Sequence, residues 1–377
     1  MNQPILQFGS SRFLQAHVDL FVSQAMACGQ ALGGIAVVQT TASAASSRRI
    51  AALAATSSYP VQIRGLANGL EVDQHLTGQA IRAALQADRD WPQVRDAVCT
   101  EVQLIVSNTG DQGYLLDPAD GPELLDSIRR VPRSFPAKLL VLLHARWCVL
   151  PAAPLSLYPC ELVSRNGDTL REVVATLAAQ WSMPAAFMLY LREHCVWVNS
   201  LVDRIVSAEL EPVGAIAEPY ALWAIERQAR MILPCTHPAI VLTDTLQDFE
   251  RLKLWLLNLG HTYLAERWLA GLLHPQATVR EAMQDTLLRV ELESVWNDEV
   301  LPVFDIFGQR AAALDYLVEL RDRLLNPFLA HRLADIAQHH AQKKQRRITP
   351  VLELARQHGL QIAQPRLHAA LASSLSA

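Results

Sequence analysis

The chain has 377 residues, of which 51% are hydrophobic and 19% are charged, as in folded globular proteins and unlike disordered chains. This length is sufficient for two domains with substantial cores. The formal net charge is −4, so the chain lacks the basic excess of a nucleic-acid-binding protein, and no nucleic-acid partner is expected.

Strand-like segments alternate with segments of helical period in the first half of the chain. The strands expected from their β-branched or apolar runs are residues 5–9, 34–40, 59–65, 102–109, 138–145 and 157–163. Between several of them lie helical stretches such as RFLQAHVDLFVSQAM. Near-continuous apolar strands alternating with helices predict a parallel sheet covered by helices on both faces, and the fold class expected here is a Rossmann-like, doubly wound α/β domain.

The second half of the chain has helical period along most of its length. The helical segments include EPYALWAIERQARMI (218–232), the run around KLWLLNLGH (253–261) and RAAALDYLVELRDRLL (310–325), and one short strand is expected at residues 239–246. The chain is therefore expected to have a nucleotide-binding domain over residues 1–193 and a mainly α-helical substrate domain over residues 194–377.

No targeting, membrane or metal-binding segment is expected. The chain begins MNQPILQFGSSRF, which runs directly into the first strand without a signal peptide. The apolar run KLLVLLHARWCVL is interrupted by His144 and Arg146 and is too short to span a membrane. The six cysteines show no CxxC spacing and the twelve histidines show no HExxH motif, so neither a disulfide framework nor a metal site is expected. These features favour a soluble, cytoplasmic protein.

Gly9 ends the first predicted strand and a helix follows at once. Phosphates bind well at such a position, because free backbone N–H groups and the helix dipole point at them. A full dinucleotide fingerprint reads GxGxxG, whereas Ser11 and Leu14 occupy the second and third glycine positions here. The acidic residue that would bind a ribose hydroxyl after the second strand is also missing, since Gln39 stands there. The choice between NAD and NADP therefore stays open.

A second polar loop reads SNTGDQG, at residues 107–113. It lies at the carboxyl end of a predicted central strand, which is the edge where ligands of open α/β sheets bind. Asn108 and Thr109 can donate hydrogen bonds to a ribose or an amide. An Asx-type turn accounts for the same residues equally well.

The segment KLWLLNLGH carries three polar residues in an otherwise apolar helix. At about 100° per residue, Lys253, Asn258 and His261 lie near 0°, 140° and 80° on the helical wheel, so all three share one side. A buried ammonium group is costly unless it is paired. Each residue alone has a structural explanation, because a lysine can extend its charged end to solvent and a core histidine can be satisfied locally. The three together favour a polar site facing a cleft.

Taken together, these segments resemble the mannitol dehydrogenase family, the polyol-specific long-chain dehydrogenases. The similarity runs from QFGSSRF near residue 7 to ITP near residue 350. It rests on the order and spacing of SNTGDQG, PCELVSRNGDTLREVV, NSLVDRIVS, EPYALWAIE, the helix with Lys253, and RLLNPFLAHRL. IRGL, PCELVSRNGD, LVDRIV and NPFLAHRLADIA are most similar to the hexuronate reductases, which interconvert tagaturonate with altronate or fructuronate with mannonate. EPYALWAIE is more similar to the mannitol and mannonate members.

The resemblance implies a role for each polar residue of the helix. Lys253 matches the lysine that acts as general acid in ketone reduction and as general base in alcohol oxidation. Asn258 matches the asparagine that polarises the reacting oxygen, and His261 matches the histidine that binds and orients the substrate. Such a lysine can supply a proton near neutral pH if burial lowers its pKa from about 10.4 toward roughly 7–8.

The resemblance also implies cofactor and substrate contacts. The cofactor is expected to be NAD, with NADP not excluded, and the residues expected to bind it are Gly9, Ser10, Ser11, Arg12, Phe13, Asn108, Thr109 and Asp203. The residues expected to bind the substrate are Asn199, Lys343 and Arg347. For a uronate substrate, Lys343, Lys344 or Arg347 of the basic cluster KKQRR would face the carboxylate.

Three departures from the mannitol enzymes weaken the expectation of a polyol substrate. Glu161 and Leu162 stand in the region of an oxygen-polarising asparagine, Asp335 stands in place of an arginine, and Ser11 stands in place of a glycine. The substrate expected is accordingly a small sugar acid or polyol, with a hexuronate favoured.

Two alternatives remain on the sequence alone. One is a mannitol 2-dehydrogenase or mannitol-1-phosphate 5-dehydrogenase. The other is a non-catalytic, nucleotide-binding regulatory protein, which the degraded glycine fingerprint favours and the presence of Lys253, Asn258 and His261 disfavours.

Overall fold

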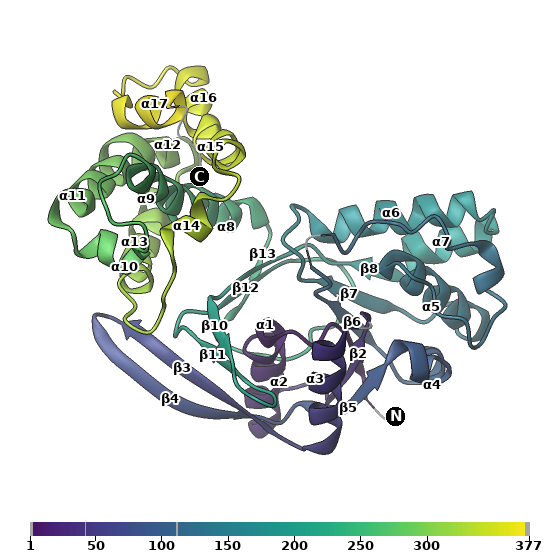
Figure 1. Ribbon diagram of the computed structural model, residues 1–377. Coiled ribbons are helices and arrows are strands. Elements are labelled where there is room, and N and C mark those ends of the chain that lie inside the picture. The colour runs from purple at the N-terminus through teal and green to yellow at the C-terminus, as the bar shows by residue number, and fades with distance from the viewer. Residues whose placement is uncertain (1–2, 42, 111, 374–377) are drawn as a thin grey trace. The chain divides into compact units, whose positions relative to one another are not determined.

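The computed structural model describes residues 3–41, 43–110 and 112–373, and the chain folds as two compact units (Figure 1). Unit 1 contains Met1–Ile63, Gln74–Ala217 and Ala221–Leu246, and unit 2 contains Arg64–Asp73, Glu218–Tyr220 and Gln247–Ala377. The chain passes from one unit to the other five times, after residues 63, 73, 217, 220 and 246. This division differs from the boundary expected at residues 193 and 194, because the segments that follow residue 194 form strands of unit 1.

The main sheet of unit 1 has six parallel strands in the order β5-β2-β1-β6-β7-β8. The strands are β1 (Ile5–Phe8), β2 (Ile35–Gln39), β5 (Ile81–Gln86), β6 (Leu104–Ser107), β7 (Leu155–Pro159) and β8 (Cys195–Trp197). The residues of β1, β2, β6 and β7 are buried throughout, which explains why these strands read as continuous apolar runs. The expected Rossmann-like domain is confirmed, and Phe8 pairs in register with Val38 on one side and Ser107 on the other.

Helices connect the parallel strands of this sheet. They are α1 (Arg12–Gln15), α2 (Val18–Ala27), α3 (Ala44–Ala55), α4 (Ala87–Thr100), α5 (Phe135–Val149), α6 (Asn166–Gln180) and α7 (Ala185–Glu193), with a short 3₁₀ turn η1 (Pro122–Leu124). The strand expected at residues 138–145 is wrong, since these residues belong to α5. The segment from Ala137 to Leu143 is buried without interruption, and a run that is apolar on every side has no period by which a helix and a strand can be told apart.

Two smaller sheets lie mainly in unit 1, although the end of β3 and the start of β4 belong to unit 2. A four-stranded sheet has the order β10-β11-β3-β4, and a three-stranded sheet has the order β13-β12-β9. Their strands are β3 (Tyr59–Ala67), β4 (Leu70–Gly78), β9 (Ser200–Asp203), β10 (Val206–Glu209), β11 (Ala215–Ala217), β12 (Leu222–Glu226) and β13 (Ile240–Thr243). The helix expected over residues 218–232 is wrong, because Trp223, Ala224 and Ile225 are fully buried in β12 and pair with both neighbouring strands. The strand expected at residues 239–246 is confirmed by β13.

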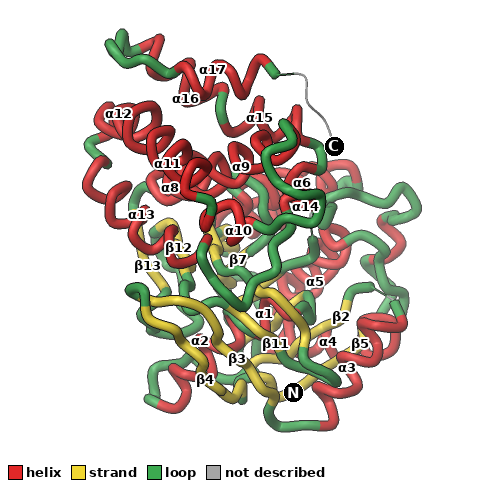
Figure 2. The backbone as a smooth tube through the Cα atoms, turned by 60° about the vertical axis from the view of Figure 1, so that its left-hand side comes forward, coloured by secondary structure: helices red, strands yellow, loops and turns green. Residues whose placement is uncertain are grey.

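Unit 2 is built almost entirely from helices (Figure 2). They are α8 (Leu246–Leu252), η2 (Lys253–Asn258), α9 (Leu259–Leu269), α10 (Val279–Gln284), α11 (Thr286–Ser294), η3 (Val295–Val300), α12 (Leu301–Phe304), η4 (Asp305–Phe307), α13 (Arg310–Leu324), α14 (Leu333–Ala337), α15 (His340–Arg347), α16 (Thr349–Gln357) and α17 (Pro365–Ala372). One continuous apolar core fills the space between them, with Trp296 and Phe304 fully buried at its centre. This part of the helical expectation is confirmed.

Two short segments from earlier in the chain belong to unit 2. Glu218 forms a buried ion pair with Arg323, at 2.9 Å between Oε1 and Nη2, and the same guanidinium lies over the ring of Tyr220. Arg64 lies over the ring of Phe328, 4.0 Å from its centroid. These contacts join residues 64–73 and 218–220 to the helices of unit 2.

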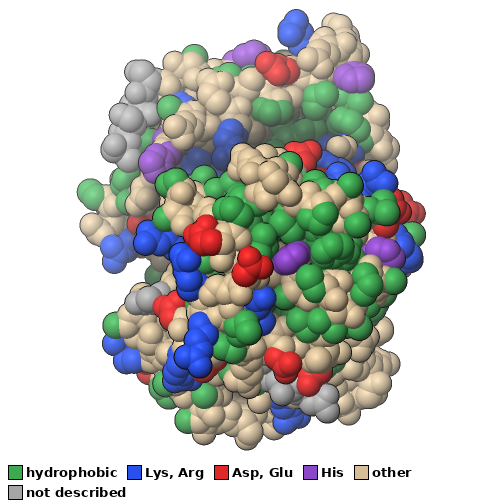
Figure 3. Space-filling model, turned by 90° about the vertical axis from the view of Figure 1, so that its right-hand side faces the viewer, with side chains coloured by type: hydrophobic (Ala, Val, Ile, Leu, Met, Phe, Trp, Pro, Cys, Tyr) green, Lys and Arg blue, Asp and Glu red, His purple; other side chains and the backbone are tan. Residues whose placement is uncertain are grey.

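On the face shown in Figure 3, basic and acidic side chains are interspersed with hydrophobic ones. Among the residues that the structure describes, no helix is long and apolar enough to cross a membrane.

Candidate functional site

The main sheet of unit 1 changes its direction of growth at β1, which has β2 on one side and β6 on the other. Ligands of open α/β sheets bind at the carboxyl edge of such a switch point. Gly9 follows β1 at this edge with a φ of +113°, and an added Cβ would lie 2.5 Å from the carbonyl oxygen of Asn108. The loops after β1 and β6 thus approach so closely that only glycine fits. This close approach of the two loops at the switch point fits a dinucleotide cofactor.

Residues 9–13, which are predicted to bind the cofactor, form the turn after β1 and the start of α1. The hydroxyl of Ser11 accepts a backbone N–H of α1 at 3.4 Å, so the serine in place of the second fingerprint glycine begins the helix. Ser10 is buried, whereas Arg12 is exposed, and the Arg12 side chain has no polar partner within the described part of the chain. Phe13 stacks on His17 with ring centroids 4.9 Å apart. Arg12 is therefore the cation that this loop can offer to a phosphate.

Gln7 and Asp19 are buried beneath the same loop. The side-chain amide of Gln7 donates to the carbonyl oxygen of Gly9 at 3.2 Å and to Oδ2 of Asp19 at 3.3 Å. Oδ1 of Asp19 has no hydrogen-bond partner among the described residues. Burial raises the pKa of Asp19 to about 7, against the opposing effect of the Gln7 hydrogen bond. Asp19 therefore changes charge near neutral pH, under the loop of Gly9.

Glu161 collects the polar groups of the SNTGDQG loop. Its buried carboxylate accepts hydrogen bonds from the hydroxyl of Ser107 at 3.0 Å, from the N–H and hydroxyl of Thr109 at 2.9 Å each, and from the hydroxyl of Tyr114 at 3.3 Å. Asn108 donates to the carbonyl oxygen of Cys160 at 2.8 Å. The side-chain donors of Asn108 and Thr109 are thus used within the protein, and Asp111 of this motif lies outside the described residues.

The contacts of Glu161 are not predicted from the sequence, in which this residue stands out only as a departure from the mannitol enzymes. Burial raises the pKa of the Tyr114 hydroxyl far above its usual value, and the negative charge of Glu161 raises it further. The signal in the sequence was the pair of hydroxyls at Ser107 and Thr109, which require an acceptor close to the end of β6.

Asn199 and Asp203 lie elsewhere in unit 1. Asn199 is fully buried; its amide donates to Asp168 at 3.1 Å and to Glu226 at 2.7 Å, and its oxygen accepts the N–H of Asp168 at 3.0 Å. Asp203 is buried at the end of β9, where it pairs with Leu222 of β12. Asn199 therefore joins the start of α6 to the β8–β9 connection through its own polar atoms.

Gln39 ends β2 at the position where an acidic residue commonly binds the ribose of NAD. Its amide donates to the hydroxyl of Ser47 at 3.2 Å and to the carbonyl oxygen of Thr41. Its side-chain oxygen is buried and has no hydrogen-bond partner among the described residues. The end of β2 thus presents a neutral acceptor where a carboxylate is usual.

In unit 2, Lys253 and Asn258 mark the two ends of η2, a turn of π-helix. A π-helix bonds each N–H to the carbonyl five residues earlier, and such turns occur frequently at functional sites. Residues five apart are therefore one turn apart and lie on the same side, closer than the angle of about 140° expected for an α-helix. Both residues are half-buried, and the side-chain amide of Asn258 has no hydrogen-bond partner in the part of the chain that is described.

A buried indole supports this turn. Nε1 of Trp296, in η3, donates to the carbonyl oxygen of Leu256 at 3.2 Å, and Trp296 is fully buried. Gly260 leaves room for the ring, since a Cβ there would lie 2.9 Å from Cζ2 of Trp296. The π-turn that carries Lys253 and Asn258 is therefore held by a contact with a second π-turn, η3 (Val295–Val300).

His261 lies in the first turn of α9 and is 7% exposed. Its ring packs edge to face against that of His331, with centroids 4.9 Å apart and an interplanar angle of 77°. Burial lowers the pKa of His331, Lys343 lowers it further, and Asp335 opposes both effects. His331 is thus a neutral group beside His261 near pH 7. His331 belongs to the motif RLLNPFLAHRL, but nothing in the sequence singles it out as a site residue.

Arg347 and Lys343, both on α15, bring their cations to the same region. Arg347 donates from Nη1 to the hydroxyl of Thr262 at 2.8 Å and to the carbonyl oxygen of Asn258 at 3.2 Å. Lys343 donates to the carbonyl oxygen of Ile336 at 2.7 Å. Burial lowers the pKa of Lys343, and the charge of Arg347 lowers it further. Burial likewise lowers the pKa of Arg347, to about 10, with a contribution from Arg346.

Neither Lys343 nor Arg347 forms an ion pair with a described carboxylate. Both donate only to carbonyl or hydroxyl oxygens, although each is partly buried. Partly buried cations without a counter-ion favour the binding of an anion. The site in unit 2 thus combines Lys253 and Asn258 with two histidines and a region of positive charge.

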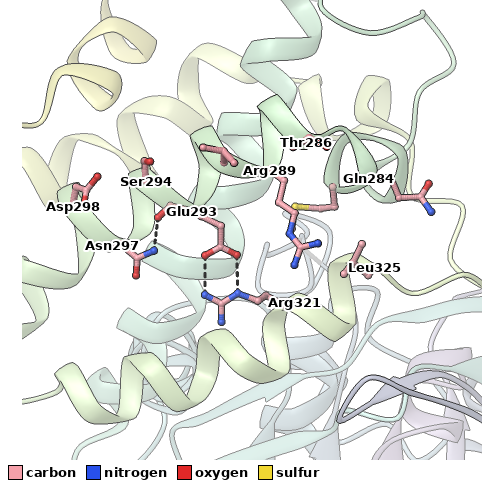
Figure 4. A pocket seen from close by; sticks show the side chains of 11 residues that line it. Gln284, Thr286, Arg289, Glu293, Ser294, Asn297, Asp298, Arg321 and Leu325 are labelled. Atoms are coloured by element: carbon pink, nitrogen blue, oxygen red, sulfur yellow. Dashed lines mark hydrogen bonds and ion pairs between the residues drawn. The ribbon is translucent and has the colours of Figure 1, made fainter.

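A cavity of unit 2 lies at a different place (Figure 4). Its volume is about 750 Å³, and an ion pair between Glu293 and Arg321, with two bonds of 2.7 Å, lies in its wall. The residues that line it are Met283, Gln284, Thr286, Arg289, Val290, Glu293, Ser294, Asn297, Asp298, Arg321 and Leu325. None of the residues predicted from the sequence lies there.

The structure thus groups the predicted residues into separate sets. Lys253, Asn258, His261, Lys343 and Arg347 are linked within unit 2 by the π-turn and by the contacts of α15. In unit 1, the loop that contains Gly9 contacts the loop that contains Asn108. Asp203 ends β9 of the three-stranded sheet, and Asn199 directly precedes that strand. No three His, Cys, Asp or Glu side chains of the described residues are grouped as ligands for a metal ion.

The chain was compared with known proteins. Residues 3–234 match the mannitol dehydrogenase Rossmann domain and residues 245–375 match the mannitol dehydrogenase C-terminal domain. Altronate oxidoreductase of Halalkalibacterium halodurans is 30% identical over 370 residues, covering 92% of this chain and 69% of the relative. Altronate oxidoreductase of Bacillus subtilis is 29% identical over 383 residues, covering 95% of this chain and 76% of the relative.

Two solved structures have a similar fold. D-Sorbitol dehydrogenase in substrate-free form superposes with a TM-score of 0.80 at 18% identity, covering 98% of this chain and 80% of the other. The Pseudomonas fluorescens mannitol 2-dehydrogenase ternary complex with NAD and D-mannitol superposes with a TM-score of 0.74 at 18% identity, covering 98% and 78%. Together with the two family domains, which between them span most of the sequence, these similarities establish that the chain belongs to the mannitol dehydrogenase family.

Proposed function

We propose that this oxidoreductase of the mannitol dehydrogenase family acts on a hexuronate, interconverting its ketone with the corresponding aldonate alcohol. The candidate pairs are tagaturonate with altronate and fructuronate with mannonate. Two kinds of observation support a sugar acid over a neutral polyol. The relatives that match over most of the chain are named altronate oxidoreductase, and the site in unit 2 carries unpaired positive charge.

The positive charge at Lys343 and Arg347 carries this proposal. Both side chains are partly buried and neither has a carboxylate partner among the described residues. A substrate carboxylate would supply the missing counter-ion, and Arg347 can bind it with two parallel hydrogen bonds. A neutral sugar would leave both charges uncompensated, so we expect it to bind more weakly.

The chemistry assigned to the chain's own residues centres on the reacting oxygen. A nicotinamide cofactor, when bound, supplies or accepts the hydride. In the reduction, Nζ of Lys253 gives a proton to the substrate oxygen, and in the oxidation it takes that proton away. The amide of Asn258 donates a hydrogen bond to the same oxygen without adding charge. His261 binds a neighbouring hydroxyl and is itself oriented by its packing against His331.

The residues proposed to hold the cofactor are those of the sheet edge in unit 1. Gly9 allows the close backbone approach, Arg12 offers a cation to the phosphates, and the loop of Asn108 and Thr109 lines the adjacent strand end. Gln39 lacks the negative charge that would repel a 2′-phosphate, so we propose that the chain accepts NADP as well as NAD. Asn199 is better explained as a residue that positions the β8–β9 connection, whereas Asp203 pairs with Leu222 of β12.

Turnover by the purified protein tests this function. NADH and NADPH oxidation is measured with tagaturonate, fructuronate, fructose and fructose 6-phosphate. Turnover with a uronate at a kcat/KM at least about tenfold above that for fructose supports the proposal. Turnover with a neutral or phosphorylated ketose alone would keep the chemistry and refute the substrate class. Binding of cofactor without any turnover would instead support a regulatory protein.

A matched pair of variants separates the charge from the helix that carries it. Arg346 is exposed and lies next to Arg347 on α15. Arg347→Met is expected to raise KM for the uronate while Arg346→Met leaves it unchanged. Equal effects of the two variants would show that general positive charge, rather than the site, controls binding.

A further inference from the structure

Three ionisable side chains meet in the interior of unit 2, and the proposed chemistry uses none of them. Oε2 of Glu266 lies 2.7 Å from Nε2 of His340 and 3.2 Å from Nζ of Lys344. The three side chains are only 6%, 1% and 3% exposed. We call these residues the Glu266 cluster. Lys344 also donates to the carbonyl oxygen of Ser373 at 2.7 Å.

The charges of the cluster balance within it. Hydrogen bonds from Ser373, His340 and Lys344 lower the pKa of Glu266 against the effect of its burial. Burial lowers the pKa of His340 although Glu266 opposes this, so His340 is neutral near pH 7. The ion pair of the cluster is then formed by the carboxylate of Glu266 and the side-chain amine of Lys344. Lys344 is therefore committed to Glu266, and it is not the cation that the basic cluster KKQRR can offer to a substrate.

The cluster lies on the two helices that carry the proposed substrate contacts. Asn258, Thr262 and Glu266 are spaced by four residues, and residues at this spacing lie on one face of a helix. The same is true of His340, Lys344 and Arg347 on α15, which are spaced by four and three. α9 and α15 are in contact.

Polar contacts connect these two faces at two levels. Arg347 donates to Thr262 and to the carbonyl oxygen of Asn258, and one turn away Glu266 accepts from Lys344 and His340. From the first level to the second, the residue numbers rise along α9 and fall along α15, so the two helices run antiparallel. A slip or rotation of α15 would break both levels together.

A buried carboxylate and ammonium tolerate little displacement. Each charge has lost its water and depends on its partner, so separating them leaves two uncompensated ions in the interior. At the other level, the side chain of Arg347 is partly exposed, so it can exchange its contacts with Thr262 and Asn258 for contacts with a ligand. The Glu266 cluster is the more deeply buried of the two levels.

We propose that Glu266 is a positioning residue for the anionic part of the substrate. Through Lys344 and His340 it fixes α15 against α9, and this keeps Lys343 and Arg347 in register with Asn258 and His261. The inference rests on the proposed function for the identity of the ligand, but the mechanical link between the two helices is independent of it.

A second buried ion pair in the same unit provides a matched control. Glu218 and Arg323 are 1% and 2% exposed and make two bonds, of 2.9 and 3.1 Å. Glu218→Gln therefore removes a comparable buried charge, but it does so at α13, away from α9 and α15. If Glu266 merely stabilised unit 2, Glu266→Gln and Glu218→Gln would have the same effects on stability and on KM.

The kinetic test compares Glu266→Gln with Glu218→Gln. Glu266→Gln is expected to raise KM for the anionic ketose by about tenfold with kcat changed less than about twofold, and to leave KM for a neutral ketose unchanged. Glu266→Asp should restore part of the lost affinity, because the charge returns with a shorter side chain. Glu218→Gln should lower the thermal midpoint without changing either KM.

Hydrogen exchange supplies a readout that needs no substrate. Glu266→Gln should speed exchange at the amides of residues 340–347 and leave those of α13 near the wild-type rates, whereas Glu218→Gln should do the reverse. If the wild-type chain does not reduce uronates, the proposed function fails while this measurement still tests the link between helices. Uniform exchange changes in both variants, or a KM that is unchanged although α15 is loosened, would overturn the proposal.

Discussion

Gly260 offers a direct test of whether the π-turn at Lys253–Asn258 matters for activity. Replacing it with alanine adds a Cβ that would lie 2.9 Å from Cζ2 and 3.4 Å from Cε2 and Nε1 of Trp296. That ring is fully buried in the core of unit 2, so it cannot move aside into solvent. The substitution must displace either the indole or the backbone of α9.

The expected cost follows from two contributions. Overpacking of a filled core costs about 1–3 kcal/mol. Displacing the indole also weakens its hydrogen bond to the carbonyl oxygen of Leu256, which is worth about 0.5–1.5 kcal/mol. The free energy of unfolding of Gly260→Ala should therefore fall by about 2–4 kcal/mol, as measured by urea denaturation.

The same displacement should reach the chemistry. Leu256 lies inside the turn that ends at Lys253 and Asn258, and misplacement of a reacting group by about 1 Å can cost on the order of 100-fold in rate. We expect kcat of Gly260→Ala to fall by about 10- to 100-fold with a smaller change in the affinity for cofactor.

Trp296→Phe tests whether crowding of the indole causes the effects of Gly260→Ala. The smaller ring vacates the space that the added methyl needs, so the double variant should be more stable than the sum of the single effects by about 1–3 kcal/mol. Additive losses in the double variant, or a Gly260→Ala protein with wild-type kcat, would refute the link between the indole and the π-turn.

Four further outcomes are expected. Lys253→Ala should abolish turnover and retain cofactor binding, as measured by fluorescence titration; activity above a few per cent of wild type would contradict its role. Arg347→Met should raise KM for a uronate by roughly 30-fold or more, since one partner of a charged pair is lost, with Arg346→Met as its control. Gln39→Asp should weaken NADPH binding by at least about tenfold and leave NADH binding nearly unchanged. Because the pKa of Asp19 is raised to about 7, its ionisation opposes folding. Stability should fall as pH rises from about 4 to 7, and Asp19→Asn should remove that slope in denaturation measured across this range.

The sequence predicted the central strands well because each is a short, uninterrupted apolar run. β1, β2 and β6 lie where expected, and their order around β1 creates the edge at Gly9. The same property misled the prediction at α5, which is buried on nearly every side and so shows no period that distinguishes a helix from a strand. At β12 the helical period of the sequence was overridden by pairing with both neighbouring strands.

The candidate site was predictable where its residues are close in the sequence. Lys253, Asn258 and His261 stood out as polar positions in one apolar helix, although the π-turn that aligns the first two has no sequence signal in an otherwise regular pattern. Contacts across long separations could not be predicted. Glu266 meets Lys344 across 78 residues, and Glu161 meets the hydroxyl of Ser107 across 54.

The five passages of the chain between the two units determine what can be exchanged between relatives. A fragment spanning only residues 247–373 would omit residues 64–73 and 218–220, leaving the buried guanidinium of Arg323 without Glu218 and Asn326 without the carbonyl oxygen of Arg64 that it binds at 3.2 Å. An unpaired buried charge of this kind costs about 3–5 kcal/mol, a large part of the stability of a typical domain. A chimera meant to transfer substrate preference would therefore have to carry three separate segments of the gene together. Recombination at a single point would divide a folding unit, so the substrate-binding helices and the two short upstream segments are expected to vary as a set.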